Sequence, residues 1–322
     1  MNWKPTASLD NLRKRAQIIA KIRDFFNKKA VLEVETPILG SASVPDLYIE
    51  SFETVYKSNT EERKLYMQTS PEFAMKRLLA AGYGAIFQIF RSFRNGEFGD
   101  RHNPEFTMLE WYQPKYDHNM LIDEVDVFLQ HVISTKPANK ISYQDLFISF
   151  LKINPHLCDK NDLWLILEKK EILPNQNINN FSRTDLLDLL FSHFIEPNIA
   201  QHEPLAVYDF PKEQAALARI EINDKGVKLA KRFEFYFKGY EIANGYFELD
   251  CAKEQLERFK LDLKARREKG LAEPAIDYNL IKALEAGMGK CAGVAVGVDR
   301  LVMIALNCRK IKDVVAFPLD IA

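Results

Sequence analysis

The sequence predicts a protein built from both helices and antiparallel strands, and three observations lead to this prediction. Apolar and polar residues alternate from Ile86 to Phe93 and again from Phe106 to Tyr112, which is the period of half-buried strands. A polar stretch that contains glycine joins these two runs, so they can pair as a hairpin. By contrast, apolar residues between Ser8 and Lys29 recur at helical spacing.

Composition is that of an ordinary globular protein. The 322 residues are 47% hydrophobic and 28% charged, enough for one large domain or two moderate ones. The formal net charge of −1 does not favour a nucleic-acid binder. The N-terminus lacks the apolar core of a signal peptide, and Asp299 and Arg300 interrupt the apolar run from Cys291 to Leu306. We therefore expect a cytoplasmic protein without a membrane span.

Two common kinds of functional site are missing from the sequence. The four cysteines show no CxxC spacing and are expected to be reduced thiols, not a disulfide frame or a zinc site. The six histidines lie apart and form no HExxH motif. Neither GxxxxGK[ST] nor GxGxxG occurs, so the two common phosphate loops are excluded.

The first elements are a helix and two strands. Ser8 is a suitable N-cap for the helix that ends near Lys29, on which Leu9, Leu12, Ala16, Ile19, Ala20, Ile22 and Phe26 form the apolar stripe. A short alternating strand runs from Val31 to Pro37, where proline ends it. A second strand, Leu65 to Ser70, leads into a helix from Phe73 to Ala81.

The residues between that strand and helix combine three helix-start signals. Ser70 offers a capping hydroxyl, Pro71 suits the first helical position, and Glu72 places an acid near the positive end of the helix dipole. A well-capped helix explains these three residues as fully as a binding site does.

The second half begins with a segment from about 117 to 200 that is expected to be a mainly helical insertion without chemistry of its own. Strands return at Arg232 to Phe237 and Tyr240 to Leu249, followed by a charged helix, Ala252 to Lys269. A small-residue strand that begins at Gly293 then runs into a helix near Arg300.

Charged residues concentrate between Phe90 and Tyr112. This stretch holds Arg91, Arg94, Arg101, Asn103, Glu105 and Glu110 among aromatic residues. A hairpin can direct such groups at one ligand, although an edge hairpin with solvated arginines would have the same composition.

Three acids recur every seven residues: Glu234, Glu241 and Glu248. Because seven is odd, regular strand pairing would place successive members on opposite faces. A turn at Lys238-Gly239 and a bulge at Gly245 could bring them together. Buried acids need a partner, so a divalent cation or a substrate ammonium is expected here.

Three segments, in this order, resemble the motifs of class II aminoacyl-tRNA synthetases. The helix and strand ending at Pro37 resemble motif 1, FRN at Phe93 to Asn95 with HNPEF at His102 to Phe106 resembles motif 2, and GVAVGVDR at Gly293 to Arg300 resembles motif 3. Within the class, HNPEFTMLEWY and EIANGYFEL are most similar to lysyl-tRNA synthetases. The resemblance extends from about Ser8 to the end of the chain.

Three departures refine this resemblance. No residues precede the motif 1 helix that could build the anticodon-binding domain of a lysyl enzyme, and Ala295 stands where those enzymes typically have glycine. Both features resemble the synthetase paralogues that modify elongation factor P. The third departure is Gly96, at a position where an acid is usual, with Glu97 beside it.

The resemblance implies an α+β fold, an antiparallel sheet flanked by helices, as a single catalytic domain over residues 1–322. It implies an enzyme that uses ATP and Mg²⁺ to activate (R)-β-lysine as an adenylate, with elongation factor P as the acceptor. It also implies a homodimer through the region from Ser8 to Pro37. A truncated lysyl-tRNA synthetase and a non-catalytic regulatory subunit are the alternatives, and tRNA is not the expected acceptor.

The resemblance also implies a role for individual residues. The positions that match the family's amino-acid pocket are Ser70, Pro71, Glu72, Tyr112, Asn244, Glu248 and Ala295. Those that match its ATP site are Arg94, Asn95, Gly96, Asn103, Phe106, Glu241, Ile242, Gly297 and Arg300. Arg94 and Arg300 match the catalytic arginines, one on the α-phosphate and one stacked on adenine opposite Phe106. Glu234 and Glu241 match the acids that hold magnesium.

Overall fold

The computed structural model describes residues 3–172 and 176–322, and these divide into two compact units. Unit 1 comprises Met1–Asp117, His131–Ile133 and Glu248–Ala322, and unit 2 comprises His118–Gln130 and Ser134–Phe247. Among the described residues, no helix combines the length and the apolar character needed to cross a lipid bilayer.

Unit 1 contains a mostly antiparallel sheet in the order β1-β5-β6-β12, in which only β1 runs parallel to its neighbour β5. A separate antiparallel sheet has the order β2-β4-β3. The strands are β1 (Leu32–Glu33), β2 (Leu39–Gly40), β3 (Glu53–Lys57), β4 (Glu62–Met67), β5 (Ile86–Phe93), β6 (Glu105–Pro114) and β12 (Cys291–Gly297). The helices are α1 (Leu9–Lys28), α2 (Glu72–Ala80), α7 (Ala252–Glu268), α8 (Tyr278–Ala286) and α9 (Val298–Leu306), with a 3₁₀ turn at Ile311–Asp313.

Helix α1 covers one face of the unit 1 sheet. It begins as predicted, because the Ser8 side chain accepts a hydrogen bond from the Asn11 backbone N–H. Phe26 stacks on Phe87 of β5 with ring centroids 4.3 Å apart and meets the edge of Trp111 of β6. These stacked aromatic rings form the core under the helix.

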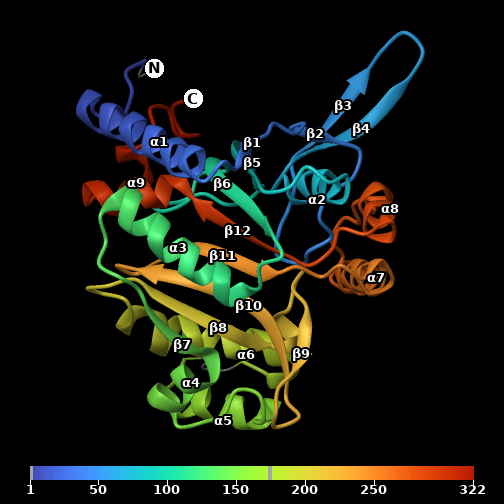
Figure 1. The fold of residues 1–322 in the computed structure, drawn as a ribbon. Coiled ribbons are helices and arrows are strands. Elements are labelled where there is room, and N and C mark those ends of the chain that lie inside the picture. The colour runs from blue at the N-terminus through green and yellow to red at the C-terminus, as the bar shows by residue number, and fades with distance from the viewer. Residues whose placement is uncertain (1–2, 173–175) are drawn as a thin grey trace. The chain divides into compact units, whose positions relative to one another are not determined.

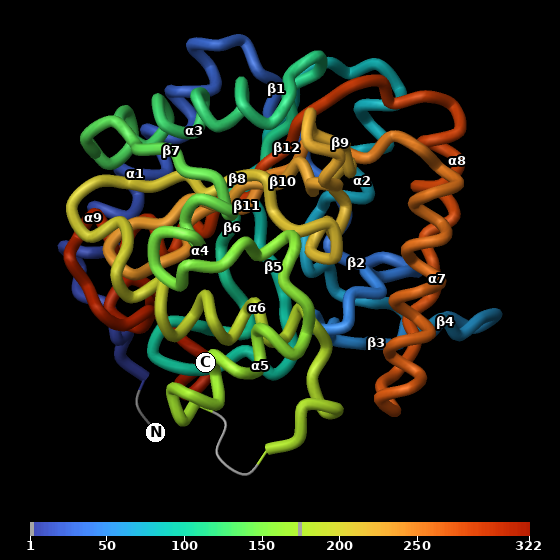
Figure 2. The backbone as a smooth tube through the Cα atoms, turned by 90° about the horizontal axis from the view of Figure 1, so that it is seen from below, coloured from blue at the N-terminus to red at the C-terminus, as the bar shows by residue number. Residues whose placement is uncertain are grey.

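Two further arrangements in unit 1 are visible in both overall views. Helices α2, α7 and α8 lie together at one side (Figures 1 and 2). Segments near the two ends of the chain also lie side by side, since the Thr6 N–H donates to the Ala316 carbonyl at 2.9 Å. The β3–β4 hairpin projects away from these elements (Figure 1).

Unit 2 has its own antiparallel core, β11-β10-β8, with β9 also paired to β10 and β7 parallel to β8. Its strands are β7 (Asn139–Ser142), β8 (Leu205–Pro211), β9 (Ile220–Ile222), β10 (Lys228–Phe237) and β11 (Tyr240–Phe247). Its helices are α3 (His118–Ile133, whose last turn falls in unit 1), α4 (Tyr143–Leu151), α5 (Lys160–Lys169) and α6 (Arg183–Leu190), a π-helical turn Phe191–Ile195, and 3₁₀ turns Ile178–Asn180, Glu196–Asn198 and Lys212–Gln214.

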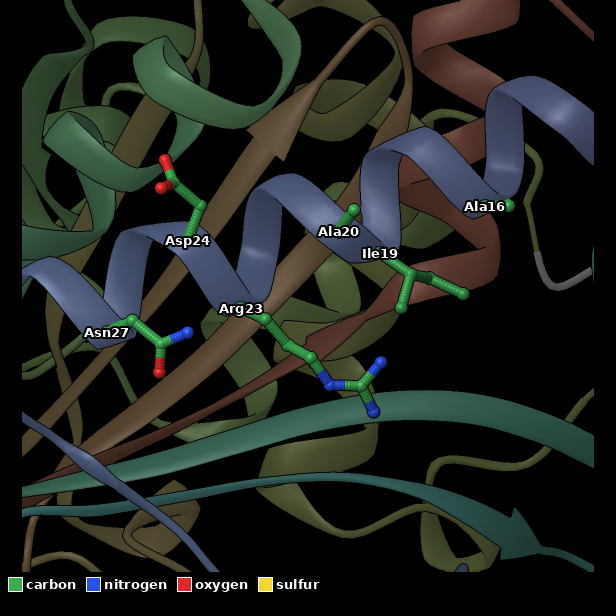
Figure 3. Close-up of a pocket in the computed structure, with 6 residues that line it drawn as sticks. All are labelled: Ala16, Ile19, Ala20, Arg23, Asp24 and Asn27. Carbon is green, nitrogen blue, oxygen red and sulfur yellow. The ribbon is translucent and has the colours of Figure 1, made fainter.

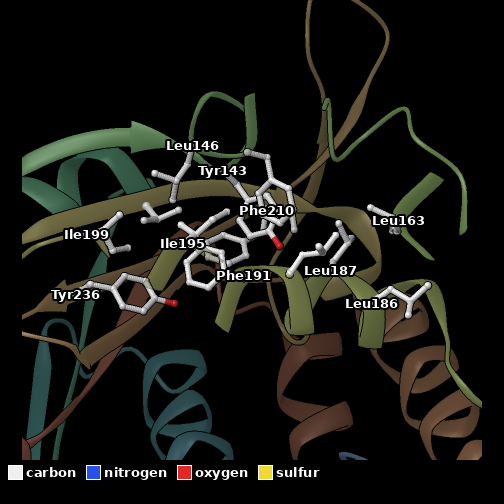
Figure 4. Close-up of a cluster of buried hydrophobic side chains, with 14 of the residues drawn as sticks. Tyr143, Leu146, Leu163, Leu186, Leu187, Phe191, Ile195, Ile199, Phe210 and Tyr236 are labelled. Atoms are coloured by element: carbon white, nitrogen blue, oxygen red, sulfur yellow. The ribbon is translucent and has the colours of Figure 1, made fainter. Parts of the chain in front are cut away.

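The helices of unit 2 pack on its strands through an aromatic and aliphatic cluster (Figure 4). Tyr143 of α4 stacks on Phe147 and on Phe191, and Phe210 of β8 closes the cluster from the sheet. Capping boxes at Asp159 and Ser182 start α5 and α6. The segment from 117 to 200 thus contains the helices expected of it and also strand β7; residues 173–175 lie outside the described residues.

The predicted combination of an antiparallel sheet and flanking helices is confirmed, and three local predictions need correction. The strand expected from Val31 to Pro37 is only two residues long, Leu32–Glu33. Strand β6 is not half-buried, because every residue from Thr107 to Gln113 is buried, on both faces. Helix α1 buries Ile18, Ile22, Phe25 and Phe26, whereas Leu9, Ala16 and Ala20 of the predicted stripe are exposed.

Candidate active site

The register of β6 with β12 selects one face of the unit 1 sheet. Gly293 lies opposite Tyr112, Ala295 opposite Glu110, and Gly297 opposite Met108. Because side chains alternate along a strand, these residues share a face, and Phe106 two residues further along β6 shares it too. The opposite face carries Trp111, which packs under α1. Small residues on β12 therefore allow polar side chains of β6 to lie close against this strand.

Gly293 allows the closest approach on this face. A Cβ atom at this position would lie 2.3 Å from Tyr112 Cε1 and 2.6 Å from Glu248 Oε1. Both distances are below van der Waals contact, so only glycine lets the phenol and the carboxylate meet over β12. Glu248 follows β11 in sequence but belongs to unit 1, where its N–H donates to the Cys291 carbonyl at 2.9 Å.

Ser70 and Glu110 belong to a buried polar cluster on this face, which we take as the candidate amino-acid pocket and define as Ser70, Glu72, Lys76, Glu110, Tyr112 and Glu248. The Ser70 hydroxyl donates to Glu110 Oε2 at 2.8 Å and accepts from the Glu72 N–H at 3.0 Å. Tyr112 donates its hydroxyl proton to the other oxygen of Glu110. The N-cap position of α2 is Pro71 and not Ser70 as predicted, so Ser70 serves the first turn and the carboxylate together.

A buried ion cluster completes the pocket. Lys76 of α2 places its ammonium 2.6 Å from Glu72 Oε1 and 2.6 Å from Glu248 Oε2. The side chains of Lys76 and Glu248 are each 1% exposed, and Glu110 is 3% exposed. Buried charges of this kind persist only when they are paired.

Burial controls protonation in this pocket. Desolvation, reinforced by the neighbouring Glu72 carboxylate, raises the pKa of Glu110 to about 7. Desolvation also raises the pKa of Glu248 to about 8, although the Lys76 ammonium acts in the opposite direction. Desolvation would lower the pKa of Lys76, but the two carboxylates beside it outweigh this and raise its pKa. The pocket therefore favours an added cation, which would keep its acids ionised.

A second group of candidate residues lies at the loop between β5 and β6. The Arg94 guanidinium lies over the Phe106 ring, 5.2 Å from its centroid, and its Nη1 is 3.6 Å from Glu97 Oε1. Within the described residues, the buried Nε of Arg94 has no hydrogen-bond partner. An arginine that packs on an aromatic ring and has an N–H group without a hydrogen-bond partner can bind an anionic ligand.

The loop itself explains the glycine at position 96. Gly96 has φ +83°, in the left-handed region that glycine adopts without strain. The neighbouring Asn95 is held by its N–H, which donates to the Glu50 carbonyl at 2.8 Å. Glu97 is thus the acid of this loop that faces Arg94.

Arg300 is positioned from two sides. Its Nη2 lies 2.7 Å from His102 Nε2, and burial together with the Arg300 charge lowers the pKa of His102, so the neutral ring accepts this hydrogen bond. The preceding Asp299 fixes the start of α9, since it lies 2.6 Å from Arg15 Nη1 and accepts from the Thr107 N–H at 2.8 Å.

Asn103 has a structural role. Its amide nitrogen donates to the Glu105 carbonyl at 2.7 Å, and its oxygen accepts from the Leu319 N–H at 3.0 Å. The buried side chain thereby fixes the loop to the C-terminal segment of unit 1.

The remaining candidates, Glu234, Glu241, Ile242 and Asn244, lie on β10 and β11 of unit 2. A bulge occurs where Phe235 pairs with Ala243 but Tyr236 pairs with Glu241, so the predicted bulge at Gly245 is wrong. The extra residue is Ile242, which is 2% exposed. Gly245 is needed instead for packing, because a Cβ there would lie 2.2 Å from Phe233 Cζ.

Because of this bulge, Glu234 and Glu241 lie on the same face, although regular strand pairing would place them on opposite faces. Glu234 lies opposite Asn244 and Tyr236 opposite Glu241, so all four share one face of unit 2. Glu234 accepts hydrogen bonds from Arg232 and from the Tyr236 hydroxyl. Burial raises the pKa of Glu234, Arg232 opposes that shift, and Glu241 adds to it.

Oxygen donors alone are available for a metal here. The described residues contain no group of three or more histidines, cysteines or acids that could hold an ion by itself. Two carboxylates fit magnesium, which often binds through one or two acids together with substrate phosphates.

The structure brings most of the predicted residues of unit 1 into two groups and places the four of unit 2 on adjacent strands. Three residues that contact these groups were not among the predicted site residues: Lys76, Glu110 and His102. The spacing of Glu72 and Lys76, four apart on a helix, could have identified Lys76. Glu110 could have been identified because it alternates with Tyr112 on a strand.

Comparison with known proteins shows the family of this chain. The chain matches the family of class II tRNA synthetases (D, K and N) over residues 1–321. It is 48% identical to the elongation factor P–(R)-β-lysine ligase of Salmonella typhi, covering 99% of this chain and 98% of that protein. It is 47% identical to the protein of the same name from Haemophilus influenzae (strain PittGG), with the same coverage. The chain therefore belongs to the class II tRNA synthetase family of the D, K and N group.

Proposed function

We propose that the protein is an ATP-dependent ligase that activates (R)-β-lysine and transfers it to the ε-amino group of a lysine of elongation factor P. The observation that carries the substrate is the buried acidic pocket of unit 1, in which Glu72, Glu110 and Glu248 gather around Tyr112. Acids in a desolvated pocket bind ammonium groups, and (R)-β-lysine has two. Relatives with this substrate in their names are nearly half identical over almost the full chain.

Two steps account for the reaction. The substrate carboxylate attacks the α-phosphorus of ATP, pyrophosphate leaves, and a mixed anhydride with AMP forms. The acceptor amine then attacks the anhydride carbonyl, an amide bond forms, AMP leaves with the bonding electrons, and the amine loses a proton. No enzyme nucleophile is needed, so catalysis depends on positioning and on stabilising negative charge.

The residues of the phosphate site have separate roles in this proposal. Arg94 holds the α-phosphate, and Arg300, fixed by His102, stacks on adenine opposite Phe106. Asn95, Gly96 and Gly297 line the nucleotide, Asn103 shapes its loop, and Ile242 supports the strand beside Glu241. Glu234 and Glu241 would hold Mg²⁺, which would supply positive charge next to the phosphate oxygens.

The amino-acid pocket is assigned in the same way. Ser70, Pro71 and Glu72 form one wall, and Tyr112 and Glu248 contact the ammonium groups. Asn244 of unit 2 is assigned to the substrate by its match to the family's motif alone. Ala295, opposite Glu110, contributes a methyl group where glycine would leave space, and this favours the β-isomer over α-lysine. Residues 1–322 act as one catalytic domain with an insertion at about 117–200, in the cytoplasm.

The acceptor is tested by competition. Purified enzyme, ATP and labelled (R)-β-lysine are offered elongation factor P and tRNA in one reaction, and the label is followed by electrophoresis. We expect label on elongation factor P and none on tRNA. Label on tRNA alone would identify a lysyl-tRNA synthetase, and a protein that catalyses no pyrophosphate exchange with any lysine isomer would be a non-catalytic relative.

The exposed side of α1 supports a homodimer. Ala16, Ile19 and Ala20 form a shallow hollow together with Arg23, Asp24 and Asn27 (Figure 3). Leu9 and Leu32, in the same region from Ser8 to Pro37, are 65% and 49% exposed. Apolar side chains gathered on one exposed side are typical of an interface.

We expect sedimentation to detect a dimer at micromolar concentration and Ala20→Arg to convert it to a monomer. Lys21→Glu, on the flank of the same helix, serves as the control and should leave the dimer intact. A wild-type protein that sediments as a monomer at these concentrations would contradict the proposal.

A further inference from the structure

The buried ion cluster contains a cation that the chain itself supplies. Lys76 follows Glu72 by one helical turn on α2, and its ammonium bridges Glu72 and Glu248 at 2.6 Å each. A lysine that is 1% exposed is rare in proteins, because transfer of an ammonium group from water is unfavourable without paired anions. Its neighbour Arg77 is exposed, so the burial is specific to this position.

The charges in the pocket match a substrate with two ammonium groups. Three carboxyl groups, Glu72, Glu110 and Glu248, surround one ammonium, which leaves two negative charges when all are ionised. The groups that act on Glu248 come from three elements: Lys76 and Glu72 of α2, Glu110 and Tyr112 of β6, and Cys291 of β12.

We propose that Lys76 is a positioning and specificity residue: its ammonium bridges the carboxyl groups of Glu72 and Glu248 and fixes them in the pocket, so that the pocket accepts an amino acid with two ammonium groups and rejects one with a single ammonium. The inference rests on the proposed substrate. In this role Lys76 does not contact the substrate, because it acts through the two acids that it bridges.

Loss of the Lys76 charge is expected to change the pKa of Glu248 in one direction only. An ammonium 2.6 Å away lowers the pKa of Glu248, so its removal raises that pKa further. Burial already raises the pKa of Glu248 to about 8 in the wild type, so in the variant an even smaller fraction of this carboxyl group is ionised at pH 7 and it pairs with the substrate less often. At higher pH it ionises again, so binding returns while the substrate amines are still protonated.

The test measures (R)-β-lysine-dependent pyrophosphate exchange from pH 6.5 to 9.5 for wild type, Lys76→Met, Lys76→Gln and the control Arg77→Met. We expect both Lys76 variants to raise KM for (R)-β-lysine at pH 7 by at least about tenfold, one pKa unit, and to recover toward pH 9. KM for ATP should stay within about twofold. Arg77→Met, which removes a charge from the exposed side of the same helix, should behave as wild type.

Specificity provides a second measurement. 3-Aminohexanoate is β-lysine without the distal ammonium, and wild type should discriminate strongly against it in kcat/KM. Lys76→Met should reduce that discrimination at pH 7, because its neutral Glu248 no longer requires a cation. Thermal unfolding verifies that each variant is folded, and Lys76→Gln, which can still donate hydrogen bonds to both acids, is the variant to use where methionine does not fold.

Three results separate the possibilities. A pH profile of KM and a discrimination ratio that both match wild type in a folded Lys76 variant would overturn the role of Lys76. A uniform fall in kcat without a change in pH dependence would show a purely structural lysine and would also overturn it. A wild-type enzyme without exchange on (R)-β-lysine would instead refute the proposed function.

Discussion

Replacement of Arg94 by alanine is expected to lower the rate of (R)-β-lysine-dependent pyrophosphate exchange by about 10²–10³-fold, the usual effect of losing one donor to a developing negative charge. Arg94 lies over Phe106, and its one charged contact, with Glu97, is long at 3.6 Å. Within the described residues its buried Nε has no partner. The guanidinium is therefore oriented but not neutralised, which suits a phosphate.

Two further variants show whether the loss of activity is specific to the guanidinium group of Arg94. Arg94→Lys keeps the charge but loses the planar, two-pronged donor, so its rate should fall between alanine and wild type. Arg91→Ala is the matched control, because Arg91 belongs to the same hairpin, is exposed, and has a similarly long contact with Glu105, 3.6 Å. If Arg94→Ala and Arg91→Ala lose equal activity, Arg94 does not contact the reacting phosphate.

The hairpin shows what a sequence can reveal about this fold. The alternation from Ile86 to Phe93 predicted β5 to the residue, and Ser8 marked the start of α1. The burial of β6 on both faces was not visible in its alternation, because Thr107 and Gln113 are polar yet buried. The Thr107 hydroxyl accepts a hydrogen bond from Arg15, and its backbone N–H donates to Asp299; both partners come from distant parts of the chain.

The bulge between β10 and β11 was predicted in principle but at the wrong residue. Glycine at 245 suggested it, although that glycine is required by the ring of Phe233 on the neighbouring strand. The extra residue, Ile242, has no composition typical of a bulge. Packing between neighbouring strands determines where Gly245 is required and where the bulge at Ile242 lies. The sequence pattern of one strand carries no information about that packing.

The residues of the pocket were predicted mainly from the resemblance to family motifs, and less from the local sequence pattern. Motifs identified Glu72, Tyr112 and Glu248, but local sequence explained Glu72 as an ordinary helix-start acid. Whether a charge on α2 is buried depends on Glu248, a residue far away in the sequence. For this reason, the sequence alone did not distinguish Lys76 from an exposed lysine, and its burial became visible only in the structure.

The second large effect is expected at Gly293, where replacement by alanine should reduce kcat/KM for (R)-β-lysine by more than about 10²-fold. Effects of this size follow from displacements of about 1 Å at a reacting centre. The new methyl group would overlap Tyr112 at 2.3 Å and Glu248 at 2.6 Å. One of them must move, and both lie in the proposed ammonium pocket.

Stability should change much less than activity, because an added methyl group in a packed site typically costs about 1–3 kcal/mol and leaves a protein folded. Gly297→Ala is the matched comparison on the same strand and face, since its nearest neighbour would be Arg300 Cβ at 3.8 Å, ordinary contact. We expect it to retain the KM for (R)-β-lysine, whatever it does to the KM for ATP. Pyrophosphate exchange at varied amino-acid concentration, with thermal unfolding of each variant, measures both effects. Should Gly293→Ala bind (R)-β-lysine as tightly as Gly297→Ala does, the amino-acid pocket does not lie over β12, because a methyl group at this position cannot coexist with Tyr112 and Glu248 where they stand.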